Sequence, residues 1–327
     1  MIQTPAARPN QLFGHVLACL DRSPLAATVL REAKILAELS EARLSALRVI
    51  PSHDPRAEIA DPVDWELRRR EEVADLLRLS DEAEGMSEVQ PIVTCGSALE
   101  RVEEEARRVG ADLLVIGAGI HGTPHRWGLG GTARLLVEAF GGSVLVVPDE
   151  LAGEPSRPRR IIVPMDGSPS SEVALRYASA IARGRSAELL VLHALPETDA
   201  PRDESAFPTR GSFSPKQSEN AEHSAEDRIG QLARLMPAHR SGHRFRRLTG
   251  TEPRRMLVKA ICEERGELVV LSARGSGNDP DLPIGSTAEY LLSRALAPVL
   301  LIRQPETRNH QPAESVPRPP AASWQGR

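Results

Sequence analysis

The sequence has few cysteines and few aromatic residues, and it has no long hydrophobic run. Its 327 residues include three cysteines that lie far apart and form no CxxC pair, which excludes a zinc ribbon or a thioredoxin-type motif. Aromatic residues make up 3% of the chain, which argues against stacking platforms for single-stranded nucleic acid. The longest apolar stretches, such as residues 113–120, are far shorter than the ~20 residues that a membrane span requires.

Lysine and net charge are also limited. No lysine follows a glycine, which excludes a Walker A phosphate loop. The formal net charge of −4 is too mild to indicate a nucleic-acid-binding protein. A sparse, odd number of cysteines is typical of a reducing compartment, and no signal-peptide pattern precedes Asp21. We therefore expect a cytoplasmic protein with neither a membrane nor a nucleic acid as its partner.

The feature that the sequence does have is an internal duplication. Residues 20–52 (LDRSPLAATVLREAKILAELSEARLSALRVIPS) align without a gap with residues 165–197 (MDGSPSSEVALRYASAIARGRSAELLVLHALPE), which places Asp21 opposite Asp166. Further along, residues 143–148 (SVLVVP) match residues 298–303 (PVLLIR), and Gly131-Thr132 matches Gly285-Ser286. The repeated unit is as long as a whole domain, so the chain is a tandem duplication and not a solenoid.

Each half predicts strands that alternate with helices. In the first half, residues 15–20 and 44–50 are apolar runs that suit buried strands, and residues 26–37 show helical spacing of their apolar positions. Ser97-x-x-Glu100 has the pattern of a capping box before a further helix. Alternation of this kind favours an α/β fold, here two tandem doubly wound parallel-sheet domains, Rossmann-like, with five strands each.

The domain boundaries follow from composition. Segments rich in proline and polar residues flank or interrupt the two repeats, and we expect them to be mobile. The predicted division is a leader at 1–13, a first domain at 14–148, a linker at 149–158, a second domain at 159–303 with a mobile insertion at about 197–225, and a disordered tail at 304–327.

Candidate ligand-binding residues stand at predicted strand ends. In a doubly wound sheet, ligands bind at the carboxyl ends of the strands, near the switch in strand order. The first strand of each repeat ends in Asp21 or Asp166, and the fourth runs into a glycine-bearing loop that opens a helix at Gly131-Thr132 or Gly285-Ser286. Backbone amides at such a helix start can hold an anion.

The strand-end aspartate, the glycine turn and the Gly-[Ser/Thr] pair together resemble the universal stress protein family, over both halves of the chain. Nucleotide-binding members of that family carry G-x2-G-x9-G-[ST] after strand four. The resemblance implies an adenine-nucleotide-alpha-hydrolase-like fold and a stress-response signalling module that binds ATP, with or without Mg²⁺. It implies nucleotide contacts at Asp21, Val49, Gly117, Gly119, Gly122, Gly131 and Thr132 in the first repeat, and at Asp166, Ala194, Ser272, Gly275, Gly285 and Ser286 in the second.

Both repeats depart from the family pattern. The second repeat has the nine-residue spacer but Ser272 at the first glycine, and its spacer carries Asp279 and Asp281, which would repel phosphate. The first repeat has two extra residues at the turn and a spacer one residue short, but it offers His125 and Arg126. We therefore expect the first repeat to be electrostatically more favourable to phosphate and the second to be closer in spacing.

Other interpretations remain open at this point. A strand-end aspartate is often only a turn residue, and Asp-x-Ser-Pro can start a helix without a ligand. No Ser-His-Asp set and no metal-ligand cluster is visible, so we name no catalytic or metal-binding residue; the alternatives are a weak ATP hydrolase, an adenylyl-transfer-type enzyme, or a nucleotide-free scaffold. The last strands, 143–147 and 299–302, are apolar enough to pair edge to edge. The resemblance implies that the two halves pair in this way and that a homo-oligomer forms likewise, besides an unknown protein partner.

Overall fold

The computed structural model describes residues 11–51, 62–83, 85, 87–119, 128–149, 160–196, 242–275, 282–294 and 297–303. The predicted insertion and tail lie outside these residues, as do nearly all of the predicted linker and most of the leader.

The two repeats contain matching series of strands and helices. The first repeat consists of β1 (His15–Cys19), α1 (Ala26–Ser40), β2 (Arg43–Pro51), α2 (Pro62–Glu82), β3 (Val89–Gly96), α3 (Ala98–Val109), β4 (Leu113–Gly117), α4 (Gly131–Ala139) and β5 (Ser143–Val147). The second consists of β6 (Arg160–Met165), α5 (Pro169–Arg185), β7 (Glu188–Pro196), β8 (His243–Gly250), α7 (Pro253–Glu263), β9 (Leu268–Ser272), α8 (Ser286–Arg294) and β10 (Val299–Ile302).

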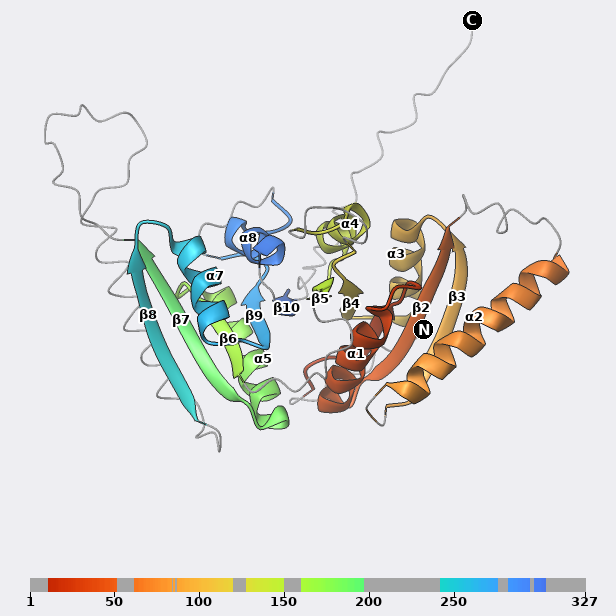
Figure 1. Ribbon diagram of the computed structural model, residues 1–327, viewed down its shortest axis with the longest axis horizontal. Coiled ribbons are helices and arrows are strands. Elements are labelled where there is room, and N and C mark those ends of the chain that lie inside the picture. Colours follow the sequence, from red (N-terminus) through yellow and green to blue (C-terminus); the bar gives the residue numbers. More distant parts are fainter. Residues whose placement is uncertain are drawn as a thin grey trace, which may run out of the picture.

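All ten strands form one continuous sheet, in the order β3-β2-β1-β4-β5-β10-β9-β6-β7-β8 (Figure 1). Pairing within each repeat is parallel, and the order 3-2-1-4-5 of the first repeat returns in reverse in the second. The two halves meet at β5 and β10, which pair antiparallel with Leu145 opposite Leu300. The predicted tandem α/β fold with five strands in each repeat is therefore confirmed.

The pairing of the last strands occurs inside one chain. β5 is bonded to β4 on one side and to β10 on the other, and β10 likewise lies between β5 and β9. Neither strand keeps an open edge, so the expectation of a homo-oligomer through the last strands is wrong. The strands that would have joined two chains are satisfied by the duplication itself.

Helices cover both faces of the sheet and define two apolar cores. α1 and α5 lie on one face and contact each other, while α3, α4, α7 and α8 lie on the other (Figure 1). The start of α5 follows its sequence closely, since Ser168 accepts a hydrogen bond from the amide of Ser171 and Pro169 occupies the first turn. At α3, Ser97 stands at the N-cap position but its side chain makes no capping bond, so the predicted capping box does not form.

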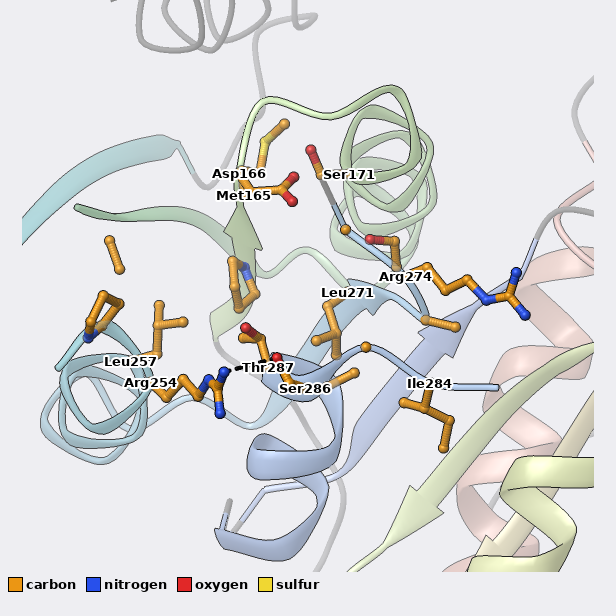
Figure 2. Close-up of a pocket in the computed structure, with 18 of the residues that line it drawn as sticks. Met165, Asp166, Ser171, Arg254, Leu257, Leu271, Arg274, Ile284, Ser286 and Thr287 are labelled. Atoms are coloured by element: carbon orange, nitrogen blue, oxygen red, sulfur yellow. Dashed lines mark hydrogen bonds between the residues drawn. The ribbon is translucent and has the colours of Figure 1, made fainter. Parts of the chain in front are cut away.

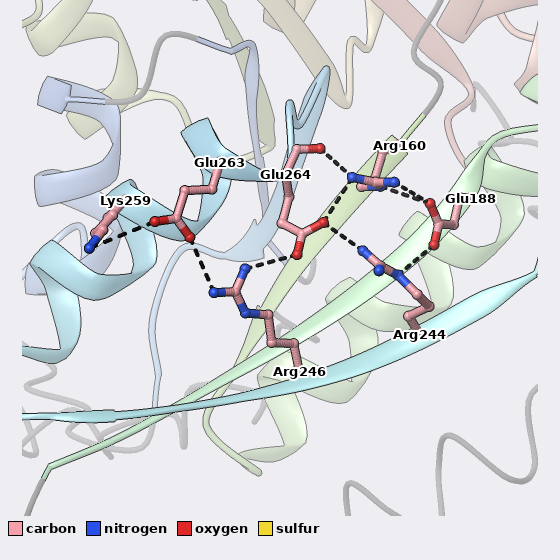
Figure 3. A network of polar contacts seen from close by, with 7 residues as sticks. All are labelled: Arg160, Glu188, Arg244, Arg246, Lys259, Glu263 and Glu264. Atoms are coloured by element: carbon pink, nitrogen blue, oxygen red, sulfur yellow. Dashed lines mark hydrogen bonds and ion pairs between the residues drawn. The ribbon is translucent and has the colours of Figure 1, made fainter.

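A network of ion pairs fastens the outer edge of the second repeat (Figure 3). Glu264, at the end of α7, binds Arg160 of β6 together with Arg244 and Arg246 of β8. Burial works against the charge of Glu264, but hydrogen bonds from the two β8 arginines outweigh it and lower the pKa of this carboxyl. Arg244 and Arg246 of the basic strand β8 are therefore paired with an acidic side chain of the same repeat.

Side-chain contacts also connect the two repeats. Arg134 and Glu289 are each the fourth residue of their helices, α4 and α8, and they pair with each other at 3.0 Å. On the opposite face, Glu32 of α1 and Arg185 of α5 form a buried pair with side chains 3% and 6% exposed. Arg303, after β10, donates hydrogen bonds to carbonyls at the end of α4. Arg134 and Glu289 thus show complementary charges at equivalent positions of the two repeats.

No helix among the described residues is long and apolar enough to cross a membrane.

Candidate functional site

Each repeat has a cavity where its strand order reverses. In both repeats the order changes direction between the first and fourth strands, and a cavity opens at the carboxyl ends of these strands. The cavity of the second repeat measures about 270 Å³ and that of the first about 230 Å³. The duplication has therefore produced two hollows at equivalent places in the fold.

The second cavity brings together every residue that the sequence nominated in that repeat. The nominated residues come from the ends of β6, β7 and β9 and from the start of α8: Asp166, Ala194, Ser272, Gly275, Gly285 and Ser286. Figure 2 shows Asp166 and Ser171 on one side of the hollow and Ser286 and Thr287 on another. An ideal Cβ built on Gly275 would lie 2.4 Å from Oδ2 of Asp166, so glycine allows this carboxylate to pack against the turn.

The first cavity gathers its nominated residues in the same way. Those that line it are Asp21, Val49, Gly117, Gly119, Gly131 and Thr132. Gly122 lies outside the described residues. The turn is compact, since Gly119 has a positive φ of 70° and a Cβ on Gly117 would lie 2.8 Å from Cδ2 of Leu25.

The two aspartates also hold their own turns. Oδ1 of Asp21 accepts hydrogen bonds from the amide and the hydroxyl of Ser23, at 2.9 and 2.5 Å. Oδ1 of Asp166 accepts one from the amide of Ser168 at 3.0 Å. Each aspartate therefore stabilises its turn, as one interpretation of the sequence proposed, and also lines the cavity of its repeat.

The structure corrects the alignment of the two phosphate-type loops. The amide of Gly130 donates to the carbonyl of Ala118 at 2.8 Å, and the amide of Gly285 donates to that of Ala273 at the same distance. Gly130, and not Gly131, is thus the counterpart of Gly285. The loops from β4 to α4 and from β9 to α8 are equally long, so the predicted extra turn residues and short spacer are wrong. The error arose because two adjacent glycines allow either register.

The two equivalent glycines differ in how tightly they are packed. A Cβ on Gly130 would lie 2.2 Å from the carbonyl oxygen of Gly119, whereas one on Gly285 would lie 3.4 Å from its nearest neighbour, the carbonyl oxygen of Ala273. We expect Gly130→Ala to reduce the free energy of unfolding by about 1–3 kcal/mol through overpacking against backbone. The matched Gly285→Ala should change it by less than about 1 kcal/mol. Urea unfolding of both variants checks this, and equal losses would contradict it.

The two cavities differ in the charged side chains that line them, which the sequence did not reveal. Arg254, the second residue of α7, lines the second cavity and donates a hydrogen bond from Nη2 to Oγ of Ser286 at 2.9 Å (Figure 2). Among the described residues, the only charged side chain that lines the first cavity is Asp21. The loop residues used to rank the repeats, His125, Arg126, Asp279 and Asp281, lie outside the described residues. The described walls by themselves therefore favour an anion in the second repeat, and the expected ranking, which depends on those loop residues, stays a prediction.

A buried arginine holds the loop that carries Asp21 at the first cavity. Arg48 of β2 donates to the carbonyl of Asp21 at 3.2 Å and pairs with Glu72 and Asp75 of α2, at 2.9 and 2.6 Å. Arg22, next to Asp21, also pairs with Glu72. The loop that carries Asp21 is thereby tied to α2. Sequence reasoning missed this link, because an arginine within an apolar strand does not reveal its partners 24 and 27 residues away.

The described cavity walls contain groups that can bind a ligand. Burial raises the pKa of the Cys19 thiol, which lines the first cavity, to about 12, so this thiol is protonated at neutral pH and is a poor nucleophile. Within the described ranges, no three histidine, cysteine, aspartate or glutamate side chains are grouped so that they could hold a metal ion. What the walls do offer is two helix amino ends, glycine turns and hydroxyl groups.

The tandem fold and its paired cavities define a doubly wound α/β protein with one candidate ligand site in each repeat, and comparison gives the family. The model of the universal stress protein family matches residues 12–148 and 158–303, and the chain belongs to this family. It is 27% identical over 277 residues to Universal stress protein Rv2005c of Mycobacterium tuberculosis, covering 80% of this chain and 90% of that protein. It is 28% identical over 194 residues to Universal stress protein Rv1996 of the same species, covering 54% of each, so the match spans about half of that relative's length.

Solved structures share the tandem arrangement. A universal stress protein from Archaeoglobus fulgidus matches 88% of this chain and 98% of its own, with a TM-score of 0.62 and 18% identity. A protein of unknown function from Pseudomonas aeruginosa matches 90% of this chain and 94% of its own, with a TM-score of 0.63 and 15% identity. At these identities the likeness supports the fold.

Proposed function

We propose that the chain is an adenine-nucleotide-binding regulatory module that takes ATP, alone or with Mg²⁺, in one or both repeats. The observation that carries the proposal is the convergence of the nominated residues on two equivalent cavities at the switch points of the sheet. Val49 and Ala194, at the ends of β2 and β7, would contact the base, with Asp21 and Asp166 at the adenosine end. The glycine turns and the starts of α4 and α8 would cradle the phosphates.

Several features fit this assignment. Glycine at positions 117 and 275 lets the chain approach a ligand closely, and Ser286 and Thr132 can donate hydroxyl hydrogen bonds. We place the module in the cytoplasm, where a stress response would act through it. ATP in the cavities would order the adjoining loops and so change the affinity for a protein partner.

The direct test is to denature purified protein and identify any released nucleotide by mass spectrometry. Calorimetry with ATP and a thermal shift then measure binding. The critical variants are Asp21→Asn and Asp166→Asn, since asparagine keeps the turn acceptor and removes the charge. We expect each to weaken ATP binding in its own repeat about 10-fold, as for loss of a charge-assisted hydrogen bond, with little change in stability.

Different results would select the other functions. Unaltered ATP affinity in both asparagine variants would leave the aspartates with their turn role alone. Protein without nucleotide whose melting temperature ATP leaves unchanged would overturn the proposal in favour of a scaffold. Steady ATP turnover that collapses in these variants would make the protein a hydrolase.

A further inference from the structure

Arg254 distinguishes the second cavity from the first. It follows Pro253 at the start of α7, and its contact with Ser286 joins the amino ends of α7 and α8. The first repeat has Leu99 at this place, because Leu99 and Arg254 each stand two residues after the N-cap of α3 and α7. Leu99 packs against the apolar core of the sheet and offers no polar group. At this helix position the second repeat therefore has an arginine in the cavity wall and the first has a leucine.

The surroundings of Arg254 favour a group of high negative charge. Two helix amino ends meet at its contact with Ser286, and each contributes a partial positive charge and unpaired amide groups. Arg274, the other arginine of this wall, extends away from Arg254 (Figure 2). Arg274 faces Arg303 instead: burial, and to a smaller extent the charge of Arg274, lower the pKa of the Arg303 guanidinium to about 10. Arg254 is thus the described cation whose side chain reaches the Ser286 side of the cavity.

We propose that Arg254 makes the second repeat a polyphosphate-selective site, which binds nucleoside di- and triphosphates in preference to monophosphates and free nucleosides. The inference rests on the proposed function and assigns the terminal phosphates to the space beside Arg254 and Ser286. The guanidinium donates to phosphate oxygens there, as planar N–H groups do in anion sites. At the corresponding place the first repeat has only the side chain of Leu99, and it gains no such preference from it.

The test uses the full-length protein and a photoreactive 8-azido-ATP label, whose attachment is assigned to each repeat by peptide mass spectrometry. Adenosine, AMP, ADP and ATP compete for labelling in the wild type, Arg254→Leu, Arg254→Lys and the reciprocal Leu99→Arg. In the second repeat we expect Arg254→Leu to weaken ATP competition about 10-fold, since one exposed charge-assisted contact is lost, and to leave adenosine unchanged. Arg254→Lys should restore part of the preference, and the wild-type preference should weaken with added salt.

Leu99→Arg should give the first repeat a stronger preference for ATP over adenosine. The inference is overturned if Arg254→Leu leaves the ATP-to-adenosine ratio of the second repeat unchanged, or weakens both ligands equally. If no nucleotide competes even in the wild type, the proposed function fails, and this inference fails with it. If ATP binds but its binding does not depend on Arg254, this inference fails and the proposed function stands.

Discussion

Replacing Glu32 by alanine is expected to destabilise the whole chain by about 3–5 kcal/mol, because it leaves the Arg185 guanidinium buried without its counter-ion. The two side chains are 3% and 6% exposed, and their contact at 3.1 Å bridges α1 of the first repeat and α5 of the second. Nε and Nη1 of Arg185 have no hydrogen-bond partner within the described structure, so the carboxylate of Glu32 is its main compensation. Urea unfolding followed by circular dichroism measures the loss.

The matched control is the other ion pair between the repeats, Arg134 and Glu289. Both side chains are more than half exposed, so Glu289→Ala should cost no more than about 1 kcal/mol. The double variant Glu32→Met with Arg185→Met should recover most of the stability, since an apolar pair needs no desolvated charges. If Glu32→Ala costs no more than Glu289→Ala, the buried pair does not join the repeats in the way described.

Arg48→Met is the second change from which we expect a large effect. The side chains of Arg48 and Glu72 are 4% and 3% exposed, and the substitution leaves the buried carboxylate with Arg22 alone, at a cost of about 3 kcal/mol. It also removes the hydrogen bond that holds the carbonyl of Asp21, so ATP binding in the first repeat should weaken while that in the second stays unchanged. A repeat-resolved binding assay and urea unfolding measure the two effects. Equal weakening in both repeats would indicate a general loss of structure.

The same cluster predicts how stability depends on pH. Burial opposes ionisation of Glu72, but hydrogen bonds from Arg22 and Arg48 outweigh it and hold the pKa of this carboxyl below its usual range. Hydrogen bonds from Arg48 and Arg78 likewise lower the pKa of Asp75. Because both pKa values are depressed on folding, the stability they confer is present above the unfolded pKa of about 4 and is lost as pH falls through the folded values. Arg48→Met should therefore flatten the acid side of the stability profile, and an unchanged profile would contradict this assignment.

Most of the fold could be predicted from local sequence patterns, because the duplication presents each pattern twice. The buried strand at 143–147 was predicted with the bounds that the structure gives, and the start of α5 follows from Asp-Gly-Ser-Pro, whose serine caps the helix. Strand-end positions such as Asp21 and Asp166 reach the cavities because parallel strands in a doubly wound sheet end at a common edge. The spacing of apolar residues and the order of strands and helices can be read directly from the sequence, so these features could be predicted.

What escaped prediction depends on contacts between distant segments. The role of Arg254 requires α7 and α8 to meet, and that of Arg48 requires α2 to pack against β2. The register of the first loop was misjudged because adjacent glycines are equivalent in sequence and become distinct only through the Gly130–Ala118 bond. The spacing of residues along the chain does not reveal contacts between segments that are far apart in the sequence.

The antiparallel pairing of β5 with β10 has a consequence for how the protein responds to dilution. Two separate chains joined through such strands would fall apart as their concentration decreased, whereas strands on one chain meet at an effective concentration set by their connection. This pairing should therefore add no dependence of the melting temperature on protein concentration. The two unlike cavities are also always present in a one-to-one ratio, however few copies a cell contains.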